Sequence, residues 1–130
     1  MKKPIREVPL PNGLTLRFFD HTRRYFGDYH QVRIEISCEL PLTADLFDDA
    51  ADCQTALKLL GPSVRYLKQV EHQGVATAAV EQTVEKVIAD FLTHSLGYFQ
   101  SPSFPRKLAH SELNRVRGKR KAFLPQHANG

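Results

Sequence analysis

The sequence has no tryptophan, one methionine and only two cysteines. Cys38 and Cys53 are too few for a disulfide framework and do not form a CxxC pair, which favours a reducing cytoplasm. No stretch approaches the roughly 18 uninterrupted apolar residues that span a bilayer, and the basic start at Met1 leads into no apolar segment. We therefore expect a cytoplasmic protein with no membrane contact.

Catalytic and ligand-binding motifs are also missing. The sequence contains no GxSxG, no P-loop and no GxGxxG, so hydrolase, NTPase and dinucleotide-binding functions lack their usual support. The six histidines are spaced too widely for a local zinc site, and the acidic run that starts at Asp45 lacks the order and glycine of an EF-hand loop. We expect no metal and no cofactor, and the sequence favours a non-enzymatic function over catalysis.

What is present indicates a folded chain. The length of 130 residues suits one domain, and a hydrophobic content of 42% with 25% charged residues is near the globular average. Residues 1–105 hold 11 Lys and Arg against 13 Asp and Glu, whereas residues 106–130 hold 7 against 1. The positive charge is therefore concentrated near the C-terminus, and a partner selected by charge would meet that segment first.

Alternating apolar residues predict the strands. The clearest alternation runs from Val32 to Leu40, and a second runs from Leu14 to Phe18 after an Asn-Gly turn. Residues 5–10 are expected to pair with the second strand. Residues 20–28 then form the long loop of an antiparallel hairpin, and a weaker alternation at 64–71 predicts a further strand.

Two further segments have helical spacing. Carboxylates ahead of an apolar stripe and the following Gly61-Pro62 predict a short helix that ends near Leu60. The main helix should cover residues 76–96 and end at Gly97. Its apolar stripe falls within one third of the circumference and consists of Val80, Val84, Val87, Ile88, Phe91 and Leu92.

These elements predict an α+β fold: a small antiparallel sheet of three or four strands, a long C-terminal helix on one face and a short crossover helix. We expect a compact domain over residues 1–105, followed by a basic extension over 106–130. Ala109, Leu113 and Val116 suggest that this extension is partly helical before it becomes mobile.

The motifs LPNGLTL and SLGYFQSPSFPRK, together with the alternating strand between them, resemble a small family of uncharacterised bacterial proteins. The resemblance covers about residues 9–107. It implies one domain in a bacterial cytoplasm and carries no assigned activity, cofactor or catalytic residue.

One candidate site lies in the loop between the first two hairpin strands. Adjacent arginines beside aromatic and imidazole groups can hold a phosphate or carboxylate, or contact a partner. The simpler alternative is a solvated hairpin tip in which Asp20 and Asp28 pair with the arginines. The candidate contact residues are His21, Arg23, Arg24, Tyr25 and Asp28.

A second candidate lies in the basic extension. A dense run of Lys and Arg releases counterions from nucleic acid without reading its sequence. Its alternatives are a solvated tail and a contact with an acidic protein. The residues concerned are Arg115, Arg117, Lys119, Arg120 and Lys121.

The sequence favours a non-enzymatic interaction or assembly module. Its partner is an unknown protein or a second copy, and Phe19 and Leu67 are the apolar residues on the sheet face that the main helix leaves open. The alternative is a nucleic-acid-binding accessory protein that uses the basic extension. A third hypothesis is an enzyme with a site in the loop from Asp20 to His30.

Overall fold

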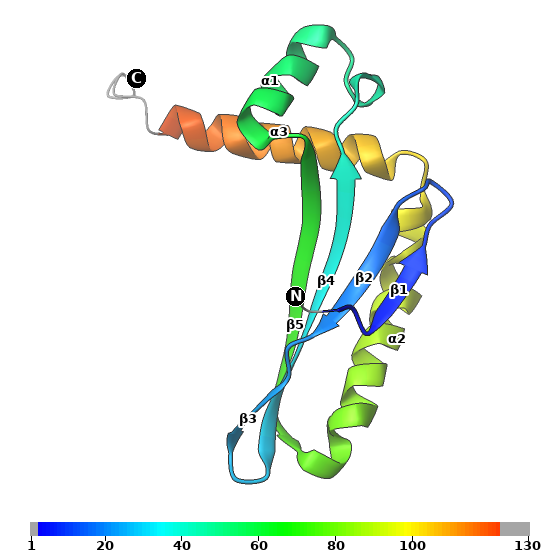
Figure 1. Cartoon of the computed structure of the whole chain (residues 1–130), viewed down its shortest axis with the longest axis vertical. Helices are drawn as coiled ribbons and strands as arrows, with labels where there is room; N and C mark the ends of the chain where they lie inside the picture. Colours follow the sequence, from blue (N-terminus) through cyan, green and yellow to red (C-terminus); the bar gives the residue numbers. More distant parts are fainter. Residues whose placement is uncertain (1–2, 123–130) are drawn as a thin grey trace. The chain divides into compact units, whose positions relative to one another are not determined.

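The computed structural model describes residues 3–122, and only the backbone of residues 119–122. It shows an α+β fold with a five-stranded antiparallel sheet and three α-helices (Figure 1). The predicted fold class is confirmed. The strands are β1 (Arg6–Pro9), β2 (Thr15–Asp20), β3 (Arg23–Phe26), β4 (Tyr29–Pro41) and β5 (Ser63–Ala76); the helices are α1 (Ala50–Leu60), α2 (Val80–Gln100) and α3 (Phe104–Ala122), with 3₁₀ turns η1 (Ala44–Leu46) and η2 (Thr77–Ala79).

The chain divides into two compact units, each assembled from two segments. The first unit comprises the chain up to Glu39 together with Arg65–Ser101, and the second comprises Leu40–Val64 together with the chain from Pro102 onward. The expected boundary at residue 105 falls inside α3, which begins at Phe104. The extension was expected to become mobile after Val116, but helix α3 continues to Ala122. The rest of the predicted mobile end lies outside the described residues.

In the first unit, β4 is the central strand. It pairs antiparallel with β2 along Ile34–Cys38, with β3 at its start, and with β5 on its other edge (Figure 1). β1 extends the sheet beyond β2, as the Asn-Gly turn predicts. The additional strand, β3, arises within the segment that we expected to be a loop.

Helix α2 covers one face of this sheet. Phe18 on β2 meets Phe91 on α2 edge to face, with ring centroids 5.8 Å apart. Val84, Val87 and Ile88 of the predicted stripe are buried against the same face. The stripe is confirmed as the helical side of the core.

The end of α2 differs from the prediction, because the helix continues through Gly97 to Gln100. A glycine within a helix is unfavourable by about 1 kcal/mol. Continuing the helix buries Phe99, which is 1% exposed and packs against Tyr66 and Phe91. Burial of a phenylalanine contributes about 1.5–3 kcal/mol and outweighs that loss. The helix ends instead ahead of Pro102, since a residue before proline disfavours helical angles.

The second unit is built from α1, η1 and α3. The Asp49 carboxylate accepts a hydrogen bond from the Asp52 backbone N–H at 2.7 Å and caps the start of α1. On α3, Leu108, Ala109 and Leu113 are buried, so this helix supplies core residues. Its basic side chains meet the acidic segment of the same unit, as in the 2.9 Å pair between Arg106 and Asp48.

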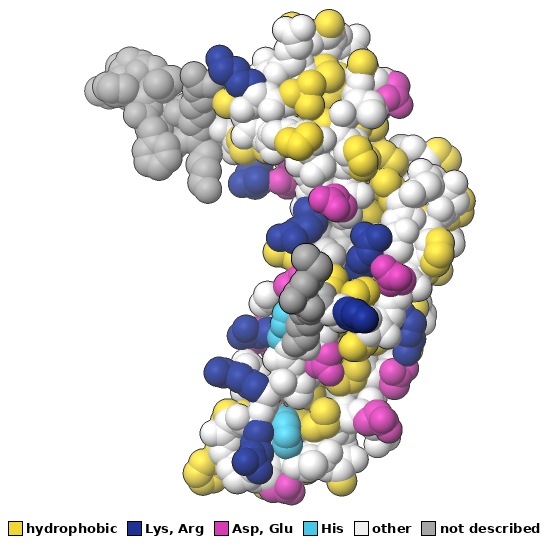
Figure 2. Space-filling view, in the orientation of Figure 1, with side chains coloured by type: hydrophobic (Ala, Val, Ile, Leu, Met, Phe, Trp, Pro, Cys, Tyr) yellow, Lys and Arg dark blue, Asp and Glu magenta, His cyan; other side chains and the backbone are white. Residues whose placement is uncertain are grey.

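The face of the sheet opposite α2 carries charges of both signs. Arg17 pairs with Glu7 at 2.8 Å, and Arg33 pairs with Glu71 at 2.8 Å. Figure 2 shows this interleaving of Lys and Arg with Asp and Glu over the strands. No helix among residues 3–122 is long and apolar enough to cross a bilayer.

Candidate functional site

The β3–β4 hairpin is exposed to solvent, and all four residues of β3 are exposed. Its strands pair from Arg23 and Gln31 to Phe26 and Tyr29, with an irregularity after Arg24. The chain turns at Gly27, whose φ of +53° suits the first position of a two-residue hairpin loop. Segment 20–28 therefore contains a tight hairpin rather than a long loop.

Three aromatic side chains project from this hairpin. Phe26 is 73% exposed, and Tyr25 and Tyr29 are each 48% exposed. We refer to these three residues as the aromatic tip. Hydrophobic atoms are visible on the surface at this end of the sheet (Figure 2). Isolated exposed apolar residues are common on proteins, but three neighbouring rings on one turn are a feature of binding surfaces.

Hydrogen bonds fix the aromatic tip to the segment that precedes α2. The Asp28 carboxylate accepts from the Thr77 hydroxyl at 2.6 Å, and the Thr77 backbone N–H donates to the Asp28 carbonyl at 3.1 Å. The Gly74 N–H donates to the Tyr25 hydroxyl at 3.0 Å. The hairpin is therefore held in place, and the phenol oxygen of Tyr25 already has a partner inside the chain.

The five predicted contact residues do not form one site. Tyr25 and Asp28 belong to the braced hairpin. His21 lies 3.3 Å from the Glu35 carboxylate, and Arg23 donates to the Gln31 side chain at 3.1 Å. Arg23 and Arg24 are neighbours on a strand, so their side chains leave opposite faces and cannot grip one anion together.

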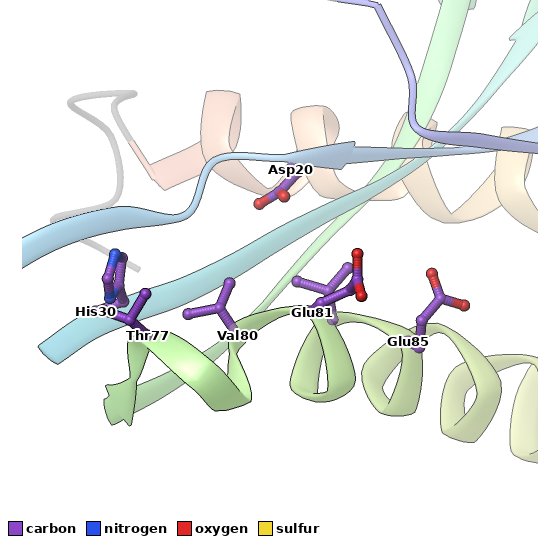
Figure 3. A pocket seen from close by; sticks show the side chains of 7 residues that line it. Asp20, His30, Thr77, Val80, Glu81 and Glu85 are labelled. Carbon is purple, nitrogen blue, oxygen red and sulfur yellow. The ribbon is translucent and has the colours of Figure 1, made fainter. Parts of the chain in front are cut away.

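A hollow of about 420 Å³ lies between the sheet and the start of α2. Asp20 and His30, the two ends of the predicted loop, line it from the strands, and Glu81 and Glu85 line it from the helix. Figure 3 shows Asp20 reaching toward α2 while the two glutamates rise toward the strands. Thr77, Val80 and Val84 complete the lining.

The hollow is acidic. Asp20 accepts from the Thr22 backbone N–H at 2.9 Å, and both Glu85 oxygens receive the Arg6 guanidinium at 2.9 and 3.0 Å. Glu81 lies in the first turn of α2, where the helix dipole favours a negative charge. The Nδ1 atom of His30 is shielded from solvent and has no hydrogen-bond partner among the described residues. The lining therefore suits a cationic or hydrogen-bonding group.

Metal binding finds no structural support. Over residues 3–122, no three His, Cys, Asp or Glu side chains converge as metal ligands. Cys38 and Cys53 are both buried, and burial raises the pKa of the Cys38 thiol, so this thiol remains protonated and unreactive at neutral pH.

Sequence reasoning missed the glutamates of the hollow. Glu81 and Glu85 lie outside the apolar stripe of α2, so the sequence pattern indicates only a solvated helix face there. Glu85 acquires its partner from Arg6, 79 residues away. The sequence offered one signal for this hollow: Asp20 and His30 lie at the two ends of the loop that we considered as a site.

The proposed nucleic-acid residues are only partly described. Arg115 pairs with Glu112 at 2.8 Å, and Arg117 pairs with Asp52 at 2.8 Å. The side chains of Lys119, Arg120 and Lys121 lie outside the described residues. These ion pairs within the second unit reduce the positive charge that Arg115 and Arg117 present to a phosphate backbone.

No protein-family model, no curated protein and no solved structure matches this chain.

Proposed function

We propose that this protein is a non-enzymatic interaction module that holds a protein partner through its aromatic tip. The observation that carries the proposal is the 73% exposure of Phe26 at the end of a hairpin that hydrogen bonds hold in place. Large aromatic residues dominate the binding energy of protein interfaces. A soluble domain gains no stability from a phenylalanine that it leaves in water.

The hydrogen bonds from the hairpin to Thr77 and Gly74 give the aromatic tip a second property of a binding element. Association is opposed by the entropy of ordering loops and side chains at the interface. Because Asp28 and Tyr25 are already bonded to Thr77 and Gly74, the hairpin loses little freedom when a partner binds. Full burial of the Phe26 ring contributes about 1.5–3 kcal/mol, which corresponds to roughly 10- to 150-fold in affinity.

The tip also indicates what the partner offers. Tyr29 pairs with Phe26 across the hairpin, Tyr25 precedes it, and Arg24 is an exposed cation on the same strand. A complementary surface has an apolar pocket for the phenyl ring and a carboxylate at its rim for the guanidinium. This description fits a folded protein surface.

Site-specific photocrosslinking tests the proposal. A photoreactive phenylalanine analogue replaces Phe26 or, as a control, Tyr98, which is 50% exposed on α2. The captured protein is then purified, and its affinity is measured by calorimetry. We expect an adduct from position 26 but not from position 98, and a loss of at least about tenfold in affinity for Phe26→Ser.

The matched control for the affinity measurement is Leu57→Ser, which removes an apolar side chain that is 41% exposed on α1. Equal adducts from positions 26 and 98, or equal affinities for Phe26→Ser and the unaltered chain, contradict the proposal.

A second candidate function is catalysis in the acidic hollow. The hollow favours it because an imidazole, His30, lines the same hollow as the carboxylates of Asp20 and Glu81, and such groups serve as general acids and bases. Thermal-shift screening against small amines separates the two functions. A ligand that stabilises the unaltered chain but not the Glu81→Gln variant supports ligand binding or catalysis in the hollow. The interaction module requires no such ligand, because it depends only on the aromatic tip.

A further inference from the structure

The turn between β1 and β2 contains the dipeptide Asn12-Gly13 and lies beside the end of α2 (Figure 1). The Gly13 backbone N–H donates to the Leu10 carbonyl at 3.1 Å, and the Leu10 N–H donates to the Leu14 carbonyl at 2.8 Å. Gly13 has a φ of +87°, in the region that favours glycine. The shape of this turn therefore calls for a glycine directly after Asn12.

The Asn12 side chain uses both ends of its carboxamide. Its Nδ2 atom donates to the Phe99 carbonyl at 2.9 Å, and its Oδ1 atom accepts from the Leu14 backbone N–H at 3.1 Å. Phe99 lies in the last turn of α2, where backbone carbonyls lack the partners that a helix interior provides. Asn12 thus attaches the β1–β2 turn to the end of a helix that lies 87 residues further along the chain.

The same dipeptide is chemically labile. Asparagine is a thermolabile residue, and a following glycine has no side chain that hinders attack by its backbone nitrogen. In deamidation, the Gly13 nitrogen bonds to Cγ of Asn12, the Cγ–Nδ2 bond breaks, and ammonia leaves with the proton that the Gly13 nitrogen gives up. Water then opens the resulting cyclic imide to aspartate or isoaspartate. The reaction therefore needs no reactant other than water.

We propose that Asn12-Gly13 is a deamidation site that the folded first unit keeps unreactive, and that its modification detaches the β1–β2 turn from α2. In the fold, the attacking nitrogen directs its proton to the Leu10 carbonyl, and hydrogen bonds fix the carboxamide at both ends. Reaction therefore requires the turn to open. The aspartate product has no N–H to donate to Phe99, and its charge lies at the negative end of the helix dipole. Opening thus permits the reaction, and the product favours further opening.

Peptide mapping by mass spectrometry measures the rate of deamidation. The full chain is incubated in mildly alkaline buffer, either folded or unfolded in urea, and mapping separates residue 12 from the second Asn-Gly pair at Asn129, which lies outside the described residues. We expect Asn12 to react at least about tenfold more slowly in the folded chain, because each hydrogen bond that must break shifts the equilibrium by roughly 2- to 12-fold. Equal rates in the two states overturn the proposal.

Asn12→Asp reproduces the aspartate product, and urea unfolding measures its effect. The matched control is Gln100→Glu, which makes the same change from amide to carboxylate at the exposed end of α2. We expect Asn12→Asp to raise the ratio of unfolded to folded chain by roughly 5- to 150-fold and Gln100→Glu by less than about fivefold. Equal effects of the two variants overturn the proposal. Neither experiment bears on the aromatic tip, since partner capture at Phe26 is measured separately.

Discussion

The Asp28 carboxylate and the Thr77 hydroxyl, 2.6 Å apart, join the turn of the β3–β4 hairpin to the segment that leads into α2. They are 49 residues apart in the sequence. The hairpin that carries the aromatic tip is thereby fixed to the longest helix of the first unit, and the predictions begin with this bond.

Thr77→Val removes the hydroxyl and keeps the shape of the side chain. We expect a loss of about 1 kcal/mol in the free energy of unfolding, since a typical hydrogen bond contributes 0.5–1.5 kcal/mol. Hydrogen exchange should accelerate at residues 24–29 more than along the centre of β4. Thr93→Val on exposed α2 is the control, and equal exchange in the two variants would show that the hairpin does not depend on the bond.

Phe91→Asp should abolish cooperative melting of the first unit. The ring packs between Phe18 and Phe99, and an unpaired carboxylate in this core costs several kcal/mol against a total stability of about 5–15 kcal/mol. Glu85→Ala should lower stability by less than about 1 kcal/mol, because its ion pair with Arg6 is exposed. A thermal melt that shows equal effects for the two variants contradicts this assignment of the core face.

Leu113→Ala should destabilise the second unit. Leu113 is 3% exposed, and truncation of a buried leucine to alanine costs about 2–5 kcal/mol. Asn114→Ala on the exposed side of α3 is the control. If urea unfolding leaves Leu113→Ala unchanged, α3 is a peripheral helix, as residues 106–130 were first expected to be.

Replacing Lys119, Arg120 and Lys121 with glutamine tests the nucleic-acid hypothesis without removing core residues of α3. If that hypothesis is correct, the full chain binds DNA or RNA with an affinity that falls steeply with salt, and the triple variant loses most of this affinity. The assay is a mobility-shift titration at about 0.15 M salt. Absence of binding by the unaltered chain would show that the hypothesis is wrong.

Stability should fall in alkaline solution partly through Cys38. Burial raises the pKa of this thiol above its ordinary value of 9.0, so above about pH 9 the unfolded chain loses a proton that the folded chain retains. The contribution of Cys38 is therefore complete below that pH and is lost as the pH rises through the folded-state pKa. Urea unfolding of Cys38→Ala at pH 7 to 10 should show a weaker decline, and identical declines contradict the assignment.

The sequence predicts those elements whose pattern reflects burial on one side. Val32 to Leu40 alternate because one face of β4 meets the core, and the stripe of α2 repeats because it packs on that face. β3 has no such pattern, since all four of its residues are exposed and it exists through pairing with the start of β4. Local periodicity carries no information about such a strand.

The candidate site was less predictable, because its contacts join distant segments. Phe26 falls in a segment that the sequence predicts as a loop, and only the structure shows that it lies on a strand with its side chain 73% exposed. The bond between Tyr25 and Gly74 and the pairing of Arg6 with Glu85 each join residues that no local spacing relates. The distribution of charge along the sequence pointed to the C-terminal tail rather than to this hairpin.

The interleaving of the two units sets an order of events during synthesis. Segment Leu40–Val64 leaves the ribosome early, but its partner helix α3 begins only at Phe104. At about 5–20 residues per second, roughly 40 intervening residues delay this helix by a few seconds. During that interval the remaining strand of the first unit and α2 are synthesised. The apolar side of α1, including Cys53 and Ala56, remains exposed until α3 has been made. A chaperone that recognises exposed apolar helices would meet this nascent chain at α1.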